Sequence, residues 1–444
     1  MTSSKLPRRY VLRALTAGAS AIAINPLLRA QTARSTDPLT ARIQTDLEKH
    51  ASFGSKRSAS PGDLKTAEWI AGRLRTSGYK VESHEFPSPF LVERSVRISC
   101  EGMTLGLYAQ TPAATTGAKG VTGRLGLIRN ASDAANTKGK IALLVLNSAR
   151  HAALGKGNGG IGGTIQAAAA AGALGVVIVT TGPSGEAALL NAPEDQVMPV
   201  PVAIMAPKQS VPFQQAAMAG AEATFILDGD TTHRNSTNII GRLERGNRWV
   251  VISTPRSGWF DCVGERGTGT SVFLELAEWA ANRYPNHSIH LVNAGAHEYY
   301  FAGSHKVMNL APPPASTDIW AHVGATVAAR DADESGPTLR MLDTADPQRS
   351  VMATTNMNAA VAEGFRGIRE LERAQPVRAD AGELSVFTDR GYSRCFAVLG
   401  LHRWLHTVAD TIERVDARLV APVLEAHRRT IEVAMADLPS RELP

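Results

Sequence analysis

The sequence predicts an α/β protein with a mainly parallel sheet flanked by helices, and with a smaller domain inserted into it. Two observations lead to this fold class. Between residues 236 and 440, apolar strand-like runs alternate with amphipathic helical runs, an order typical of parallel sheets covered on both faces. Between residues 119 and 228 the sequence pattern is different: it predicts short apolar strands, a glycine-rich loop and a helix of small residues.

The first elements of the mature chain read as helix, turn, helix over residues 38–80. In Asp63–Ser77 apolar residues recur at helical spacing, and Gly78 ends the pattern. Tyr79–Phe86 then alternates as a strand.

The middle of the chain predicts a separate set of elements. The expected strands and helix are Lys140–Val145, Ile165–Ala171 (helix), Gly175–Val179 and Val200–Ala206. Gly157–Gly163 reads as a flexible loop, because Lys156 precedes the glycines and the spacing of a phosphate-binding loop is absent. This order resembles the protease-associated domain, a non-catalytic insert of secreted peptidases. We therefore predict an insert at 119–232 and a main domain at 34–118 and 233–444.

The last part of the chain supplies the strands and helices of the main domain. The expected strands are Trp249–Thr254, Ser288–Ala294 and Ile319–Val327, and the expected helices are Ser271–Arg283, Met357–Arg373 and Leu419–Met435. Sites in such sheets lie at the carboxyl ends of the strands, so the residues that follow each strand are the candidates for function.

The N-terminus predicts export. Arg8 and Arg9 precede an apolar stretch, Ala14–Ile24, and this pattern resembles a twin-arginine signal. Eleven residues are too few to span a hydrocarbon core, which needs about 20. We therefore expect residues 1–33 to be a removable signal and the protein to be periplasmic or secreted, with no stable membrane anchor.

The net charge of +6 is mostly a property of this signal, which holds five of the excess basic residues. A mature chain with about one excess positive charge gives no support for nucleic-acid binding. The three cysteines, Cys100, Cys262 and Cys395, allow at most one disulfide, and the sequence does not say which pair would form it.

Carboxylates and imidazoles follow the predicted strands. Gly264-Glu265-Arg266 lies after the first of them, His297-Glu298 after the second, His322 within the third, and His406 near Asp410 further on. Such oxygen and nitrogen donors are what a catalytic zinc needs, with three protein ligands and one position for water. A serine or cysteine nucleophile has little support, because the sequence lacks a Gly-x-Ser-x-Gly motif.

The order of several short motifs resembles the secreted zinc aminopeptidases of metallopeptidase family twenty-eight. The motifs are Asn238-Ile239-Ile240-Gly241, Leu274-Glu275-Leu276-Ala277, Gly303-Ser304 and His406-Thr407 with Asp410-Thr411. The resemblance covers most of the mature chain. It implies the fold of these enzymes, a peptide or amide substrate, and a site assembled from the strand ends.

The resemblance also implies roles for single residues. Glu298 and His406 match liganding positions, Glu265 stands where the family has an aspartate that bridges two metals, and His322 stands at another aspartate ligand. His297 replaces the glutamate that serves as the base, and its unperturbed pKa near 6.5 suits that work. The family's first histidine is missing, since Pro255 or Trp259 stands there.

These departures predict one zinc ion in preference to two, held by Glu265, Glu298 and His406, with His322 as a further candidate ligand. The expected function is an exported zinc-dependent hydrolase of peptide or amide bonds. Two alternatives stay open: a degenerate member that binds peptides or another ligand without turnover, and a one-zinc aminoacyltransferase similar to the glutaminyl cyclases.

Overall fold

The computed structural model describes residues 37–147, 152–155, 160–180, 182–195, 197–336, 338–378 and 381–438. From Pro38 onward the chain forms one compact unit. The predicted signal at 1–33 lies outside the described residues. Across the described part, every helix is too short or too polar to cross a membrane.

The two N-terminal helices form as the sequence predicts. α1 spans Pro38–Ser52 and α2 spans Pro61–Thr76. Ser60 caps α2, because its side chain accepts a hydrogen bond from the backbone of Asp63, and Pro61 follows it at the first helical position. This cap fixes the start of α2 and places Asp63 in its first turn, where that residue becomes part of the buried network described below.

The centre of the main sheet is parallel and orders the candidate residues. β9 (Trp249–Pro255) pairs in parallel with β10 (Ser288–Ala294) on one side and with β11 (Thr317–Val323) on the other. β11 pairs in parallel with β16 (Cys395–Gly400). The carboxyl ends of these four strands therefore meet at one edge of the sheet. β14 (Arg349–Ala353) and β15 (Ala374–Pro376) extend it beyond β16.

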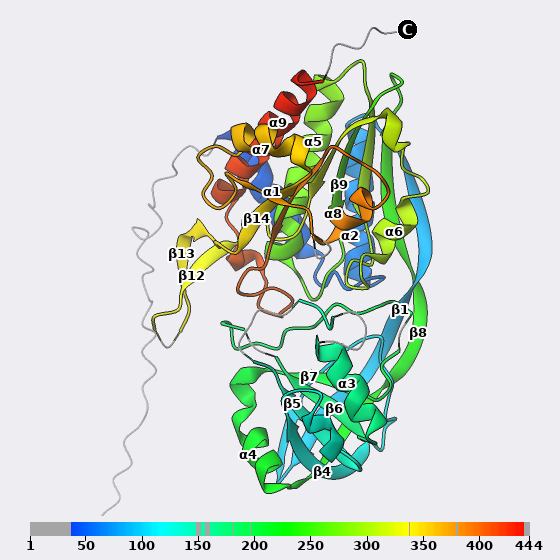
Figure 1. Cartoon of the computed structure of the whole chain (residues 1–444), viewed down its shortest axis with the longest axis vertical. Helices are drawn as coiled ribbons and strands as arrows, with labels where there is room; N and C mark the ends of the chain where they lie inside the picture. The colour runs from blue at the N-terminus through cyan, green and yellow to red at the C-terminus, as the bar shows by residue number, and fades with distance from the viewer. Residues whose placement is uncertain are drawn as a thin grey trace, which may run out of the picture. The chain divides into compact units, whose positions relative to one another are not determined.

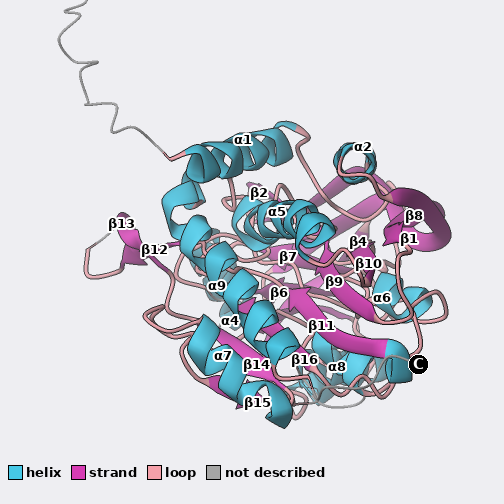
Figure 2. Cartoon of the chain, turned by 90° about the horizontal axis from the view of Figure 1, so that it is seen from above, coloured by secondary structure: helices cyan, strands magenta, loops and turns pink. Residues whose placement is uncertain are grey.

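Both faces of this sheet are covered, as predicted. Val250 and Ile252 of β9 belong to the core shared with the helices α1, α2, α5 (Thr268–Arg283), α7 (Asn358–Gly364) and α9 (Ala417–Ala436). Val251 points to the opposite face, where it joins Trp320 and the residues of α8 (Glu383–Thr388). α6 (Ala302–Val307) contacts β10 and α8. Figure 2 shows α1, α5 and α9 grouped together over the sheet.

Two long antiparallel strands link the two parts of the sheet. β1 (Lys80–Cys100) pairs with β8 (Glu222–Leu243) along almost its entire length, and Figure 1 shows them side by side. β8 pairs with β10 at one end and with β4 at the other. The sheet is thus continuous from the main domain into the middle segment.

The middle segment has its own hydrophobic clusters around a small mixed sheet. Its elements are β2 (Met103–Gly106), β3 (Tyr108–Ala109), β4 (Val121–Ile128), β5 (Lys140–Val145), α3 (Gly160–Ala170), β6 (Gly175–Val179), β7 (Val202–Met205) and α4 (Val211–Ala219). The predicted strands and small-residue helix therefore form, but the loop expected at Gly157–Gly163 is wrong from Gly160 onward, because α3 begins at that residue. The limits 119–232 for an inserted domain stay a prediction, because contacts group this segment with the main domain in one unit.

The helix predicted at Met357–Arg373 is wrong in length, because α7 ends at Gly364. A side chain at Gly364 would meet Thr430 of α9 at 2.0 Å, so the glycine allows a close approach of the two helices. Gly367 then has a φ of +79°, which turns the chain out of helical geometry. β12 (Arg330–Asp333) and β13 (Arg340–Ala345) form a separate two-stranded ribbon.

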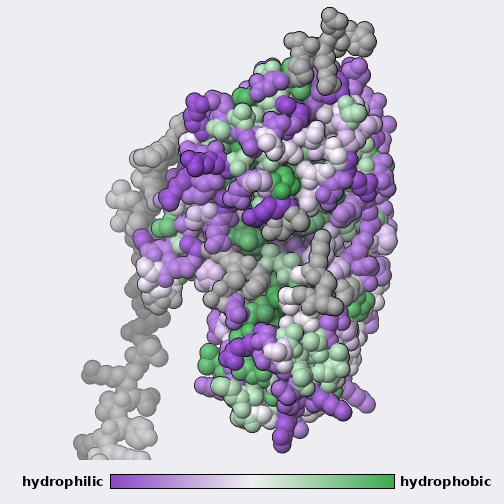
Figure 3. Space-filling model, in the orientation of Figure 1, coloured by the Kyte–Doolittle hydropathy of each residue, from purple (hydrophilic) through white to green (hydrophobic). Residues whose placement is uncertain are grey.

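All three cysteines are buried and free of disulfide bonds. Figure 3 shows one face of the molecule, on which hydrophilic residues predominate. The exposed large hydrophobic side chains include Val211 and Met218, both on α4.

Candidate functional site

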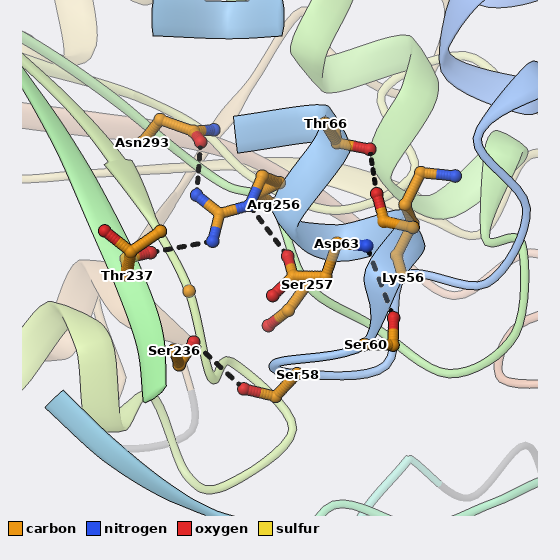
Figure 4. A network of polar contacts seen from close by, with 12 residues as sticks. Lys56, Ser58, Ser60, Asp63, Thr66, Ser236, Thr237, Arg256, Ser257 and Asn293 are labelled. Carbon is orange, nitrogen blue, oxygen red and sulfur yellow. Dashed lines mark hydrogen bonds and ion pairs between the residues drawn. The ribbon is translucent and has the colours of Figure 1, made fainter. Parts of the chain in front are cut away.

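A buried arginine joins the end of β9 to its neighbours (Figure 4). Arg256 Nε lies 2.7 Å from Asp63 Oδ1, and both side chains are fully buried. The other guanidinium nitrogens donate to Asn293 Oδ1 at 2.9 Å and to the Thr237 carbonyl oxygen at 2.7 Å. Every nitrogen of this guanidinium therefore has an acceptor, and the loop after β9 is held against α2, β8 and β10.

Glu298, the predicted ligand after β10, is engaged by the protein itself. Its Oε1 accepts a hydrogen bond from the Ser58 backbone at 2.7 Å, and its Oε2 accepts one from Ser257 Oγ at 2.5 Å. Burial raises the pKa of Glu298, and the hydrogen bond from Ser257 opposes that shift. The side chain is thus directed to the loops that precede α2 and follow β9.

Glu265 is positioned by a carboxylate clamp on its backbone. It lies in a short π-helical turn, Val263–Gly267. The carboxylate of Asp410 accepts from the backbone N–H of Gly264 at 2.7 Å and from that of Glu265 at 3.0 Å. A side chain at Gly264 would lie 2.7 Å from Asp410 Oδ1, so only glycine permits the clamp. His402 Nε2 lies 3.2 Å from the other oxygen of Asp410.

The Glu265 carboxylate contacts two nitrogen-bearing side chains. Arg266 Nη2 lies 2.8 Å from Glu265 Oε1, and His406 Nε2 lies 3.2 Å from the same oxygen. Burial disfavours the charged form of Glu265, but the charge of Arg266 and the hydrogen bond with His406 outweigh it and hold the pKa of this carboxyl well below its usual range. Glu265 is therefore an ionised carboxylate in a dry environment.

The middle segment of the chain reaches into this site. His406 Nδ1 lies 2.9 Å from the carbonyl oxygen of Leu189, whose own N–H donates to the His406 carbonyl at 3.1 Å. Ala192 donates its N–H to the Glu298 carbonyl at 3.0 Å, and Asn191 Oδ1 accepts from Trp259 Nε1 at 3.1 Å. Residues 189–192 thus fix the backbones of both His406 and Glu298.

A second group of side chains meets at Glu383, in the first turn of α8. His297 Nδ1 lies 3.0 Å from Glu383 Oε1, and His322 Nε2 lies 3.3 Å from Oε2. His322 Nδ1 also lies 2.8 Å from Ser253 Oγ. Burial lowers the pKa of His297, with the charge of Arg266 as the next cause, and lowers that of His322 to about 4. Both imidazoles are therefore neutral at neutral pH.

The two groups form one electrostatic cluster. The charge of Arg266 influences the pKa of Glu265 and Glu383, and also that of His297 and His322. All members are almost fully buried except His297, whose side chain is 12 % exposed. An incoming ligand would therefore meet His297 first.

Strained backbone surrounds this cluster. His406 has a φ of +60°, and the loops beside it contain further non-glycine residues with positive φ: Phe260, Cys262, Ala296, Tyr300 and Phe301. Left-handed conformations of such residues are costly and gather at functional sites, where the surrounding packing maintains them. Their concentration at the strand ends supports this edge of the sheet as the site.

The structure brings together some of the predicted residues and separates others. Glu265 and His406 are in contact, while His297 and His322 share the Glu383 carboxylate. The hydrogen bonds to the Glu298 carboxylate come from Ser58 and Ser257, and from none of these four side chains. Sequence reasoning missed Glu383, whose only signal is its place at the start of a short helix, and it assigned Arg266 no part in the site.

The donor set does not fit a zinc ion. Within the described ranges, no three histidine, cysteine, aspartate or glutamate side chains converge as metal ligands. Zinc takes at least three protein ligands. Glu265 and His406 could supply two, but both Glu298 oxygens already accept hydrogen bonds, and a guanidinium nitrogen contacts the same Glu265 oxygen as His406. We therefore derive no chemical step through a metal.

Comparison with known proteins places the fold in a class. No protein-family model matches the chain, and no curated protein matches it in sequence. Among solved structures, the chain has the fold of zinc aminopeptidases. It is similar to a zinc aminopeptidase from Bacillus subtilis, with a TM-score of 0.69 and 19% identity over 89% of this chain and 95% of that one.

Two further structures are similar over nearly their whole length. One is a peptidase precursor of family twenty-eight from Shewanella amazonensis, with a TM-score of 0.68 and 17% identity over 91% of this chain and 97% of that one. The other is an aminopeptidase from an Aneurinibacillus species, with a TM-score of 0.62 and 16% identity over 89% and 93%. At these sequence identities the similarity shows the fold alone.

Proposed function

We propose that the chain binds a peptide or amide substrate at the Glu265–Arg266–His297 centre and hydrolyses its amide bond. The observation that carries this proposal is the contact of His297 Nδ1 with Glu383 Oε1 at 3.0 Å. It gives the one partly exposed member of the cluster the arrangement of a general base, on a scaffold that it shares with aminopeptidases.

His297 would act through its second nitrogen. Because Glu383 accepts from Nδ1, that nitrogen carries the proton and Nε2 retains its lone pair. Nε2 takes a proton from water as the water oxygen attacks the carbonyl carbon. The same proton then passes to the leaving amine as the carbon–nitrogen bond breaks, which restores the neutral imidazole. The lowered pKa of His297 keeps Nε2 unprotonated at neutral pH.

Arg266 would stabilise the charge that develops on the carbonyl oxygen. Its Nη1 is buried and has no hydrogen-bond partner among the described residues. A fixed donor in a dry site stabilises an oxyanion more than water does, and loss of one such donor typically costs about a hundredfold or more in rate.

The test is hydrolysis of amino-acid arylamides and short peptides by the purified mature protein and by His297→Gln. Loss of at least about a hundredfold in kcat is expected for a general base, with a smaller change in KM. His233→Gln is the matched control, because His233 is exposed on β8. Absence of turnover in the wild type across the panel would refute the proposal.

A second candidate is ligand binding without turnover. It is favoured by the engagement of both Glu298 oxygens with Ser58 and Ser257, which leaves a family liganding position closed. Calorimetric binding of peptides that are recovered intact would support this candidate and exclude hydrolysis. A conversion of N-terminal glutamine peptides would instead indicate the aminoacyltransferase alternative.

We further propose that the protein works outside the cytoplasm. The support is the twin-arginine pattern of residues 1–33, which lie outside the described residues, together with a fold shared with a peptidase named as a precursor.

A further inference from the structure

Arg266 is an unusual residue to find at the centre of this site. Its side chain is fully buried, and it follows directly on Glu265 in the π-helical turn after β9. Nε donates to the Ser257 carbonyl at 2.8 Å, which holds the guanidinium in place, and Nη2 lies 2.8 Å from Glu265 Oε1. An arginine side chain stays protonated in proteins, so this position carries a permanent positive charge.

Arg266 lies beside a buried carboxylate. Its Nη2 is 2.8 Å from Glu265 Oε1, and both side chains are almost fully buried. The second buried carboxylate of the centre, Glu383, contacts imidazoles instead, with His297 Nδ1 at 3.0 Å and His322 Nε2 at 3.3 Å. Arg266 is therefore the permanent cation next to Glu265.

A divalent cation would need the same place. A zinc ion on Glu265 and His406 would have to contact Glu265 Oε1 or its neighbour Oε2, within a few ångströms of the guanidinium nitrogen that already contacts Oε1. Like charges at such a distance in a dry site repel strongly. The remaining candidate ligands are directed elsewhere, since Glu298 faces Ser58 and Ser257 and His322 faces Ser253 and Glu383.

We propose that the guanidinium of Arg266 replaces the metal ion in this centre, so that the protein folds and binds its ligands without a divalent cation. The proposal concerns the cation content of the site and does not depend on hydrolysis. A protein without turnover could still have Arg266 in the place of the metal. A hydrolase that contains zinc would refute this proposal and leave the proposed hydrolysis intact.

The test compares metal binding by the wild type and by Arg266→Met, which keeps an unbranched apolar side chain and removes the guanidinium and its charge. We expect the purified wild type to contain no stoichiometric zinc and its melting temperature to be unchanged by chelator or by added zinc. In Arg266→Met the carboxylate of Glu265 loses its cation, so the variant should melt earlier. Zinc or cobalt would then have two protein ligands, Glu265 and His406, with water completing its coordination, so it should raise the melting temperature in a saturable manner but only at high concentration.

The double variant Arg266→Met with Glu265→Gln is the control for this gain. It removes the carboxylate as well, so its melting temperature should no longer respond to zinc. Visible absorption of the cobalt complex gives a second readout of coordination. About one equivalent of zinc in the wild type, removed by chelator with loss of stability, would overturn the proposal even if Arg266→Met does not fold. Failure of zinc to stabilise a folded Arg266→Met would also count against it.

Discussion

Replacement of Arg256 by methionine should destabilise the protein strongly. The guanidinium of Arg256 and the carboxylate of Asp63 form a contact of 2.7 Å with no exposed surface on either side chain. Removal of the arginine leaves Asp63 buried with one remaining donor, the Ala59 N–H at 3.0 Å, and leaves two acceptors without their donor. Removal of one partner of a buried ion pair typically costs roughly 3–5 kcal/mol.

That cost is large against the stability of a typical domain, which is about 5–15 kcal/mol. Equilibrium unfolding in urea, followed by tryptophan fluorescence, measures it. Arg256→Met, Asp63→Asn and the double variant form a thermodynamic cycle. Because both single variants leave one buried partner unmatched, the double variant should cost less than their sum by about 2 kcal/mol or more.

A surface pair provides the matched control. Arg283 Nε and Glu432 Oε1 lie 2.8 Å apart, nearly the same separation, but their side chains are 54% and 39% exposed. Arg283→Met should change the free energy of unfolding far less than Arg256→Met does, because solvent screens exposed pairs. The reasoning would be refuted if both arginine variants cost the same, or if the Asp63–Arg256 cycle were additive.

Two other predictions concern acid sensitivity and export. Burial lowers the pKa of His427 to about 4 from its ordinary value of 6.5. The imidazole lies between the rings of Phe365 and Phe396, and its Nδ1 contacts the Val423 carbonyl oxygen. The titratable group influenced by its charge is His322. The stability that the neutral imidazole contributes is complete above pH 6.5 and is lost as the pH falls toward 4. The gain in free energy of unfolding on His427→Phe should therefore be larger by about 2 kcal/mol at about pH 5 than at about pH 8, as measured in paired urea titrations. An equal gain at both pH values would contradict this cause. Replacement of Arg8 and Arg9 by lysine should retain the protein in the cytoplasm, as measured by fractionation and immunoblotting, whereas Lys5→Arg should leave export unchanged; export of the double-lysine variant would disprove the twin-arginine signal.

The sequence allowed the fold to be predicted because its signals are periodic and local. The strands β9 and β10 and the helices α5 and α9 are apolar or amphipathic runs with clear ends, and the candidate residues at the strand ends do meet at one edge of the sheet. The helix expected at Met357–Arg373 failed because a glycine at 364 serves a tertiary contact with α9, which no local pattern reveals.

The site was less predictable because it depends on where side chains point. In the sequence, Glu298 and Glu265 are equally good candidate metal ligands. In the structure, Ser58 and Ser257 donate hydrogen bonds to the Glu298 carboxylate, whereas Arg266 and His406 contact the Glu265 carboxylate. Glu383 comes from a short helix far along the chain, and only the packing of α8 against the sheet brings it to His297 and His322. Spacing in the sequence carries no information on such convergence.

The backbone of the centre is held by contacts that do not depend on the cation beside Glu265. Asp410 fixes the turn that carries Glu265 through two backbone N–H groups, and residues 189–192 fix His406 and Glu298 through backbone hydrogen bonds. None of these contacts involves the atoms that would bind a metal. Because the geometry of the centre is maintained by the backbone, the cation that neutralises Glu265 can change while the strand ends, the glycine at 264 and the strained loops remain in place.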